Sequence, residues 1–351
     1  MRKAFFTAAL AAAALVSAAA PAGAQSDILL RLRSGSPLGD RFRVDSASGV
    51  VAKGVLGIGI IPQTGSGERM MWYPYKASFR VGGIDGTQWD DSNTGFYSFA
   101  AGNNTVASGY YSLAVGGGSK AQGNYSMAVG QLNNADGSGA VALGTRTTAD
   151  ADYSVAIGQR ASTNGHAGAI VFADGSTTDS LEASANNQFS VRAAGGYRLF
   201  TNATTTTGVQ VAAGGSSWVV ISDRNRKQDF LNVNGEDILA RIRQLPVSTW
   251  RYRDEVDRST LHIGPMAQDW HRAFGFTADD RTINMSDFDG VNLAGIQALE
   301  ARTGGQARSI EAQAREIQAL KEQNAALQAQ NQRLEERMRR LEAVVEAGAR
   351  P

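Results

Sequence analysis

Cysteine is absent from the 351 residues, so no disulfide can hold this fold together. Stability therefore has to come from burial, which a single chain of this composition supplies poorly. Glycine accounts for 40 residues, and much of the 42% hydrophobic content is alanine. Glycine loses the most conformational freedom on folding, and alanine buries little area per residue. Oligomerisation is the expected remedy.

Strong net charge and long apolar runs are also missing. The formal net charge is +1, which gives no electrostatic argument for binding nucleic acid or an anionic membrane surface. Beyond the N-terminal segment, no run of eighteen apolar residues occurs, so we expect no transmembrane anchor in the mature chain. We expect no cofactor and no bound metal.

The first residues have the pattern of an export signal. Arg2 and Lys3 precede a mainly alanine stretch at 4–20, and small residues at 22–24 predict signal-peptidase cleavage before Gln25. A membrane anchor is the alternative, but the apolar stretch is short. The sequence predicts an exported protein, extracellular or on the surface of a Gram-negative-type bacterium, with the periplasm as an alternative.

A fourteen-residue repeat fills the middle of the chain. Its copies follow a pattern close to Tyr-Ser-x-Ala-x-Gly and begin at residues 97, 111, 125, 139 and 153, with a weaker copy from Ala167. Alternating apolar residues predict a short strand, and the glycine with its polar followers predicts a turn. A fixed period indicates stacked repeats. Each repeat should form one coil of a thin solenoid, with two short strands, two turns and an alanine-lined interior that favours several chains side by side.

This repeat resembles the head of trimeric autotransporter adhesins of the YadA type, over residues 97 to about 172. In that family, similar Ser-x-Ala-x-Gly units form a left-handed parallel β-roll shared by three chains. The resemblance implies a trimeric β-roll here. It ends before the C-terminal region, where we expect a charged helix, so autotransport is not inferred.

We also expect β-strands in the regions on either side of the repeat. Alternation such as Ser-Phe-Arg-Val at 78–81 predicts strands before it, and 189–192 and 197–200 are strand candidates after it. The aromatic residues Trp72, Tyr73 and Tyr75 form either a binding platform or a local core or subunit contact.

The sequence changes character at residue 221. A Ser-Asp-Arg-Asn-Arg-Lys segment at 222–227 is followed by a helical pattern at 238–242, an alternating strand at 245–252 and Gly-Pro-Met-Ala-Gln-Asp at 264–269. These pieces resemble the endosialidase-type intramolecular chaperone, the self-cleaving peptidase family at the C-termini of phage tail spikes and fibres. The resemblance extends from 222 to about 300.

The resemblance implies a Ser-Lys dyad, with Ser222 as nucleophile, Lys227 as general base and Ile221-Ser222 as the scissile bond. A serine hydroxyl is a poor nucleophile until a base takes its proton, and a neutral lysine amine can be that base. Because the substrate is the chain's own bond, proximity replaces substrate binding and one turnover suffices.

Neighbouring residues have candidate supporting roles. Arg224 would supply positive charge that favours a neutral lysine, and His262 either polarises the scissile carbonyl or has a structural role. Arg226 stands where the family usually has an apolar residue. As an alternative to the dyad, Ser222 or Asp223 caps the helix that follows.

A heptad pattern predicts a coiled coil from Ile296 onward. One seam consists of Ile296, Thr303, Ile310, Ile317, Asn324, Asn331, Met338 and Val345, and the other of Leu299, Gln306, Gln313, Leu320, Leu327, Leu334 and Leu341. The two asparagines cost stability and fix the register. The polar, glycine-containing stretch at 303–306 predicts a hinge or a frayed junction.

Together these patterns predict a mainly β protein with a C-terminal α part. The expected domains are a signal peptide (1–24), an N-terminal β-rich region (25–94), a left-handed parallel β-roll (95–175), a β-rich connector (176–221), a small α+β chaperone and autoprotease domain (222–295) and a coiled coil (296–347).

The expected function is that of a homotrimeric fibre or adhesin-like protein, with an unknown surface receptor or glycan as a further partner. Its peptidase activity would be a single turnover on its own chain. The alternatives are an adhesin with an uncleaved stalk, and a glycan-degrading enzyme, for which the repeat offers few of the paired carboxylates required.

Overall fold

The computed structural model describes residues 28–33, 40–46 and 49–348. The predicted signal peptide and its cleavage site before Gln25 lie outside the described residues. The chain divides into two compact units, Met1–Ser222 and Asp223–Pro351, which are taken in turn below.

The first unit begins with two small antiparallel arrangements. Strands β1 (Ile28–Arg33), β2 (Asp40–Asp45) and β3 (Gly49–Ala52) form a three-stranded sheet in that order. Strands β4 (Gly67–Tyr73) and β5 (Ser78–Ile84) then form a hairpin around the short helix η1 (Pro74–Lys76). β5 pairs in parallel with the next strand, β6, and so begins the solenoid.

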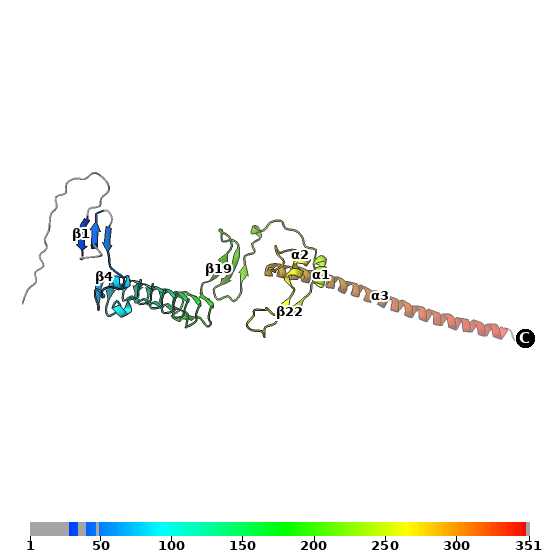
Figure 1. Ribbon diagram of the computed structural model, residues 1–351. Coiled ribbons are helices and arrows are strands. Elements are labelled where there is room, and N and C mark those ends of the chain that lie inside the picture. Colours follow the sequence, from blue (N-terminus) through cyan, green and yellow to red (C-terminus); the bar gives the residue numbers. More distant parts are fainter. Residues whose placement is uncertain (1–27, 34–39, 47–48, 349–351) are drawn as a thin grey trace, which may run out of the picture. The chain divides into compact units, whose positions relative to one another are not determined.

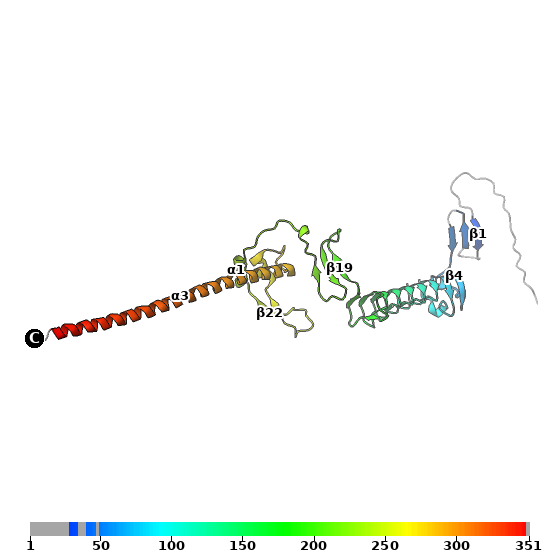
Figure 2. The same ribbon diagram turned by 180° about the vertical axis from the view of Figure 1, so that it is seen from behind.

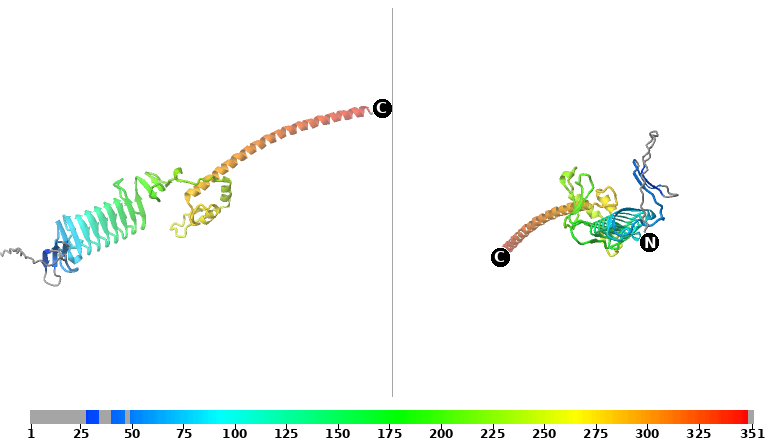
Figure 3. Two further views of the ribbon diagram at one scale, coloured as in Figure 1. Left: turned by 90° about the horizontal axis from the view of Figure 1, so that it is seen from above. Right: turned by 90° about the vertical axis from the view of Figure 1, so that its left-hand side faces the viewer.

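The repeat folds into a β-solenoid of about five turns over residues 99–173, as the fourteen-residue period predicts. Figures 1 and 2 show its strands as a stack from cyan to green, and Figure 3 shows the stack from above.

The strands of the solenoid form two sheets. The longer strands continue the sheet of β4 and β5, which has nine strands in all. These longer strands are β6 (Phe99–Asn103), β8 (Leu113–Gly117), β10 (Met127–Gln131), β12 (Val141–Thr145), β14 (Val155–Gln159), β16 (Ile170–Ala173) and β18 (Phe189–Arg192). The shorter strands form a six-stranded sheet: β7 (Val106–Ala107), β9 (Lys120–Ala121), β11 (Asn134–Ala135), β13 (Thr148–Ala149), β15 (Ala161–Ser162) and β17 (Leu181–Glu182).

Alanine fills the interior of the solenoid. Because the register repeats every fourteen residues, Ala114, Ala128 and Ala142 lie in line on neighbouring strands. These alanines are fully buried, as are Ala121 and others on the short strands. The coil has room for little else, which is why the repeat keeps alanine at this position. At the last coil the period lengthens by one residue, and Val171 pairs where alanine would stand.

The repeated glycine has an equally direct cause. Gly116 has φ +112°, and a Cβ atom built on it would lie 2.0 Å from the carbonyl oxygen of Gly130 in the next coil. Only glycine adopts this backbone conformation easily and leaves the coils room to approach. The glycine is therefore required by the solenoid itself.

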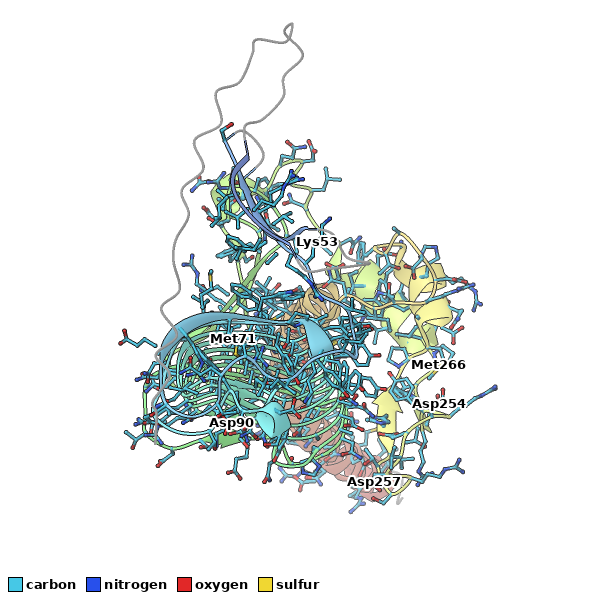
Figure 4. All side chains as sticks on the ribbon, turned by 60° about the vertical axis from the view of Figure 1, so that its left-hand side comes forward. Lys53, Met71, Asp90, Asp254, Asp257 and Met266 are labelled. Atoms are coloured by element: carbon cyan, nitrogen blue, oxygen red, sulfur yellow. The ribbon has the colours of Figure 1, made fainter. Side chains whose placement is uncertain are left out.

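Arg80 closes the N-terminal end of the alanine core. It pairs with Ala100 on β6, so it occupies the interior column, and it is fully buried. Its guanidinium donates to the Ser98 carbonyl (3.1 Å), the Ser98 hydroxyl (2.8 Å) and the Ala107 carbonyl (3.0 Å). Burial lowers the pKa of Arg80 to about 10. Figure 4 labels Met71 and Asp90, which lie at this end of the solenoid.

The rest of the first unit is an antiparallel sheet. Strands β19 (Gly196–Phe200), β20 (Gly208–Ala212) and β21 (Val219–Val220) pair in that order. The strand candidates at 189–192 and 197–200 correspond to β18 and β19.

The second unit is a small α+β domain that continues into one long helix. Its elements are α1 (Gly235–Gln244), β22 (Ser248–Trp250), β23 (His262–Gly264), α2 (Ala267–Phe274) and α3 (Met285–Gly348). The core consists of Ile238, Trp270, Phe274 and Val291, which come from all three helices. The strand predicted at 245–252 is shorter than expected, because only 248–250 pair with β23.

Helix α3 begins eleven residues before the predicted coiled coil, because its first turns belong to the domain core through Phe288, Val291 and Ala294. The hinge predicted at 303–306 is wrong: α3 continues through Gly304 and Gly305 (Figure 3). Each glycine costs a helix only about 1 kcal/mol, and contact with α1 extends to this level, where Arg302 pairs with Glu236. Among the described residues, no helix is long and apolar enough to span a bilayer.

Candidate functional site

The predicted scissile bond lies at the end of the last strand of the first unit. β21 ends at Val220, and the backbone N–H of Ile221 donates to the carbonyl oxygen of Gly208 at 3.2 Å. Ile221 is thus still held by the sheet. Ser222, the next residue, is exposed in the single chain and ends the first unit.

The residues between Ser222 and Lys227 form a single helical turn. The short helix η3 covers Arg224–Arg226. The Asp223 carboxylate accepts from the backbone N–H of Asn225 at 2.9 Å and from its side-chain amide at 3.1 Å. The N–H of Lys227 closes the turn on the carbonyl of Arg224. Asp223 therefore has the capping role that the sequence left open, and the turn fixes the backbone between the two predicted dyad residues.

Arg224 has an aromatic partner. Its guanidinium lies 5.4 Å from the ring centroid of Phe230, within the range of a cation–π contact. All residues from 222 to 233 are exposed in the single chain, including Phe230 and Leu231. Large apolar side chains left open beside a polar turn indicate a surface that a partner covers.

His262 lies on β23, directly opposite Trp250 of β22. Its ring stacks on Trp250 with centroids 4.6 Å apart and meets the edge of Tyr252 at 5.4 Å. Its Nε2 atom lies 3.1 and 3.2 Å from the two carboxylate oxygens of Glu255. These contacts of His262, with Trp250, Tyr252 and Glu255, all lie within this hairpin and its loop.

Of the aromatic residues near the N-terminal end of the solenoid, Tyr73 and Tyr75 belong to a local aromatic cluster, whereas Trp72 lies at the surface. Tyr73 is buried, and its hydroxyl donates to Asp91 at 2.8 Å. Burial, followed by this hydrogen bond, raises the pKa of Tyr73 well above its usual range. Tyr75 stacks on Tyr73 and contacts Phe96, and Trp72 is partly exposed.

Two residues with close side-chain partners, Glu255 beside His262 and the buried Arg80, are absent from the sequence-based expectations. Glu255 lies in an irregular loop whose composition gives no periodic signal. Arg80 stands in an alternating strand, at the position that alanine fills in each of the strands β6, β8, β10, β12 and β14. An alignment of the β5 sequence with the repeat would have shown arginine at the alanine position.

Comparisons with known proteins support both resemblances. Residues 222–278 match the family model described as Chaperone of endosialidase. The YadA head domain repeat (2 copies) matches at 94–119, 107–133 and 135–161. Comparison with curated proteins and with solved structures gives no match. The two family matches point to a homotrimer, and the head repeats point to a surface or extracellular protein.

Proposed function

We propose that this chain is an exported trimeric fibre or adhesin-like protein whose C-terminal domain is a trimerisation chaperone that cuts itself off between Ile221 and Ser222. One observation carries the proposal. The chaperone match begins at Ser222, immediately after the last residue that the β19–β21 sheet holds, and the boundary between the two compact units lies one residue later, after Ser222. A cut there would separate two folded units without breaking either.

The outer face of the nine-stranded sheet supports assembly of three chains. Side chains alternate along a strand, so the residues on either side of each buried alanine point outward. They form two apolar columns with partial exposure, Leu113, Met127, Val141 and Val155 in one and Val115, Val129, Leu143 and Ile157 in the other. A continuous apolar sheet face of this kind is expected to be covered.

The heptad seam of α3 supports the same conclusion. Its apolar residues are about half exposed or more in the single chain, among them Ile310 (65%), Leu320 (52%) and Leu334 (46%). An apolar seam of 3.5-residue period is buried only when helices of other chains pack against it. The helix would thereby bring three chains into register before the solenoids pair.

The proposed cleavage balances as an acyl shift followed by hydrolysis. Lys227, as a neutral amine, takes the proton of the Ser222 hydroxyl, and Oγ bonds to the carbonyl carbon of Ile221. The C–N bond breaks as that proton passes to the amide nitrogen, leaving an ester on Ser222. Water then splits the ester, giving a carboxylate on Ile221 and a free amine and hydroxyl on Ser222.

The exposure of residues 222–227 in the single chain determines the expected order of assembly and cleavage. Burial favours the neutral amine that this mechanism needs, whereas residues 222–227 are open to solvent in the single chain. Contact with partner chains would cover them, so cleavage should follow assembly. The head would then be unable to reverse its folding easily, because the chaperone that aligned it has gone.

The test is the size of the expressed protein. The wild-type chain should yield a C-terminal fragment of 130 residues that begins at Ser222. Ser222→Ala and Lys227→Ala should leave the chain whole, while the matched controls Ser217→Ala and Lys321→Ala should be cut normally. Cleavage of the Ser222→Ala chain at the same bond would refute the dyad. An intact wild-type trimer would favour the uncleaved stalk.

A further inference from the structure

A column of tyrosine rings runs along one edge of the solenoid, at the turn that precedes each long strand. Tyr97, Tyr111 and Tyr125 hold the same position in successive coils. Their ring centroids are 4.8 Å and 5.2 Å apart, and neighbouring ring planes differ by only 8° and 6°. The spacing of parallel strands sets this interval. The turn therefore presents a ladder of parallel aromatic faces.

The tyrosine ladder is interrupted at the fourth coil. Gly139 takes the place of the tyrosine there, and Tyr153 follows in the fifth coil. The backbones of Tyr125 and Tyr153 are thus two strand spacings apart, about 9–10 Å. These are also the most exposed of the four rings, at 66% and 73%, against 42% for Tyr97 and 51% for Tyr111. The interruption leaves one face of Tyr125 without a ring from the next coil.

The turn itself does not require the rings. Each of the four tyrosines has a φ between +56° and +60°, in the left-handed region where bulky residues are uncommon. Gly139 takes the same turn with φ +67° and no such strain. Strained residues of this kind gather at ligand sites. Four strained tyrosines in one column therefore point to a role for the ring faces.

Carboxylates surround the interruption. Three of them are exposed on the turns of the coils that carry Gly139 and Tyr153, namely Asp136, Asp150 and Asp152. The Asp152 carboxylate accepts from the backbone N–H of Ser138 at 2.8 Å, which places it beside Gly139. The positive charge of Lys120 acts on Asp136, so Asp150 and Asp152 hold most of the negative charge. A negative field over open aromatic faces favours a cationic ligand.

The earlier coils show how close such a carboxylate lies to the tyrosine ladder. Tyr110 comes directly before Tyr111, and their ring centroids are 6.5 Å apart. Asp152 has the same position relative to Tyr153 as Tyr110 has to Tyr111. A cation over the ring of Tyr153 is therefore within reach of the Asp152 carboxylate.

We propose that the interruption at Gly139 binds a quaternary ammonium group of the choline type, between Tyr125 and Tyr153 and with Asp152 as the counter-charge. This goes beyond the proposed function and does not depend on cleavage. A cation is attracted to an aromatic face within about 6 Å of the ring centroid, so a group in an interval of about 9–10 Å reaches both rings. A primary ammonium is strongly hydrated and loses more on leaving water, which favours the methylated form.

The experiment compares three small probes by titration calorimetry with the full-length protein. Choline carries the quaternary ammonium, ethanolamine carries a primary ammonium, and dimethylbutanol has the shape of choline with carbon in place of nitrogen. Choline should bind at least about fivefold more tightly than either of the others. Equal binding of choline and dimethylbutanol would refute the role of charge, and ethanolamine that binds as well as choline would refute the quaternary ligand. Absence of choline binding to the wild type would overturn the proposal altogether.

Substitutions locate the site. Tyr125→Leu and Tyr153→Leu should each weaken choline binding roughly two- to thirtyfold, the range of one cation–π contact, and Asp152→Asn should also weaken it. Gly139→Tyr should abolish binding, because the new ring would complete the tyrosine ladder in a turn that already holds tyrosine in four coils. The added Cβ lies 3.1 Å from the Tyr153 ring, a side chain that can shift.

Two matched controls keep the test specific. Tyr97→Leu removes a ring at the far end of the tyrosine ladder, and Glu182→Gln removes an exposed carboxylate on β17. Both should bind choline as the wild type does, and circular dichroism checks that every variant is folded. If Tyr97→Leu weakens binding as much as Tyr125→Leu, or if Gly139→Tyr binds normally, the site is not at the interruption.

The result is separable from the proposed function. The uncut Ser222→Ala chain should bind choline with wild-type affinity. A wild-type chain that stays whole and binds choline would refute the cleavage and leave this site standing. A chain that is cut at Ile221-Ser222 but does not bind choline would refute this site alone.

Discussion

Replacement of the repeat glycine should damage the solenoid far more than replacement of its neighbour. In Gly116→Ala the new Cβ would lie 2.0 Å from the carbonyl oxygen of Gly130, whereas Cβ atoms keep at least about 3.0 Å from such atoms. The coils would have to move apart by about 1 Å. That movement weakens the parallel pairing of β8 with β10.

The magnitude follows from two contributions. A residue other than glycine at φ +112° costs about 1–3 kcal/mol. Two weakened ladder hydrogen bonds add about 1 kcal/mol each. The free energy of unfolding should therefore fall by at least about 3 kcal/mol per chain, which for a unit of this size lowers Tm by about 6–12 °C.

The matched control is the next residue. Around Gly117, no described atom lies within 4 Å of an added Cβ, and its φ is outside the left-handed region. Gly117→Ala should therefore leave Tm unchanged or raise it slightly, because alanine has less freedom in the unfolded chain. Both variants are made in the full-length Ser222→Ala chain and melted by circular dichroism. Equal melting of the two would refute the close-approach argument.

Three further outcomes are expected. Arg80→Met should lower the stability of the head by about 1.5–3 kcal/mol, seen in chemical unfolding, because it removes the guanidinium hydrogen bonds to Ser98 and Ala107, whose carbonyls keep the backbone N–H groups of Phe79 and Gly95 as donors. Asn324→Ile combined with Asn331→Ile should raise the melting temperature of the helical signal while native mass spectrometry shows mixed oligomers, because the asparagines fix register. Residues 25–221 expressed without the C-terminal part should aggregate, whereas the same head matured from the full chain should resist heat and detergent; a truncated head that reaches the same stable trimer would contradict the chaperone role.

The sequence predicts the repeat region well because its constraint is local and recurs. Each fourteen-residue unit meets a copy of itself, so the alanine and the glycine are needed at every turn and the period shows them. Where the repetition stops, prediction weakens. Arg80 takes the alanine position at one end and Val171 at the other. Each of these strands adjoins a strand outside the regular fourteen-residue repeat, β4 beside β5 and β18 beside β16.

For the candidate site, the sequence offers a motif instead of a repeat. Ser222 and Lys227 were identified through a motif, and the motif carries no information about what surrounds it. The capping role of Asp223 follows from its own turn, so the local sequence is enough to predict it. The contact of Glu255 with His262 could not be predicted, because it depends on the β22–β23 hairpin, whose loop folds back onto β23. The heptad pattern also does not show where α3 begins, because the first turns of this helix pack in the domain core instead of in the seam.

The composition of the two units explains why they would need each other. A solenoid coil lined by alanine gains little from its own burial, and parallel strands pair only after a connecting loop has been ordered. Three such chains must also meet in register before the apolar columns on their sheets are covered.

The second unit has the larger side chains that drive early folding. Trp270 and Phe274 lie in a core that α1, α2 and α3 share, and α3, with 64 residues, also bears the heptad seam. Folding should therefore begin at the C-terminus and proceed toward the head. A cut between Ile221 and Ser222 would then remove the starting point once it is no longer needed, leaving a trimer whose unfolding has to break many small contacts together.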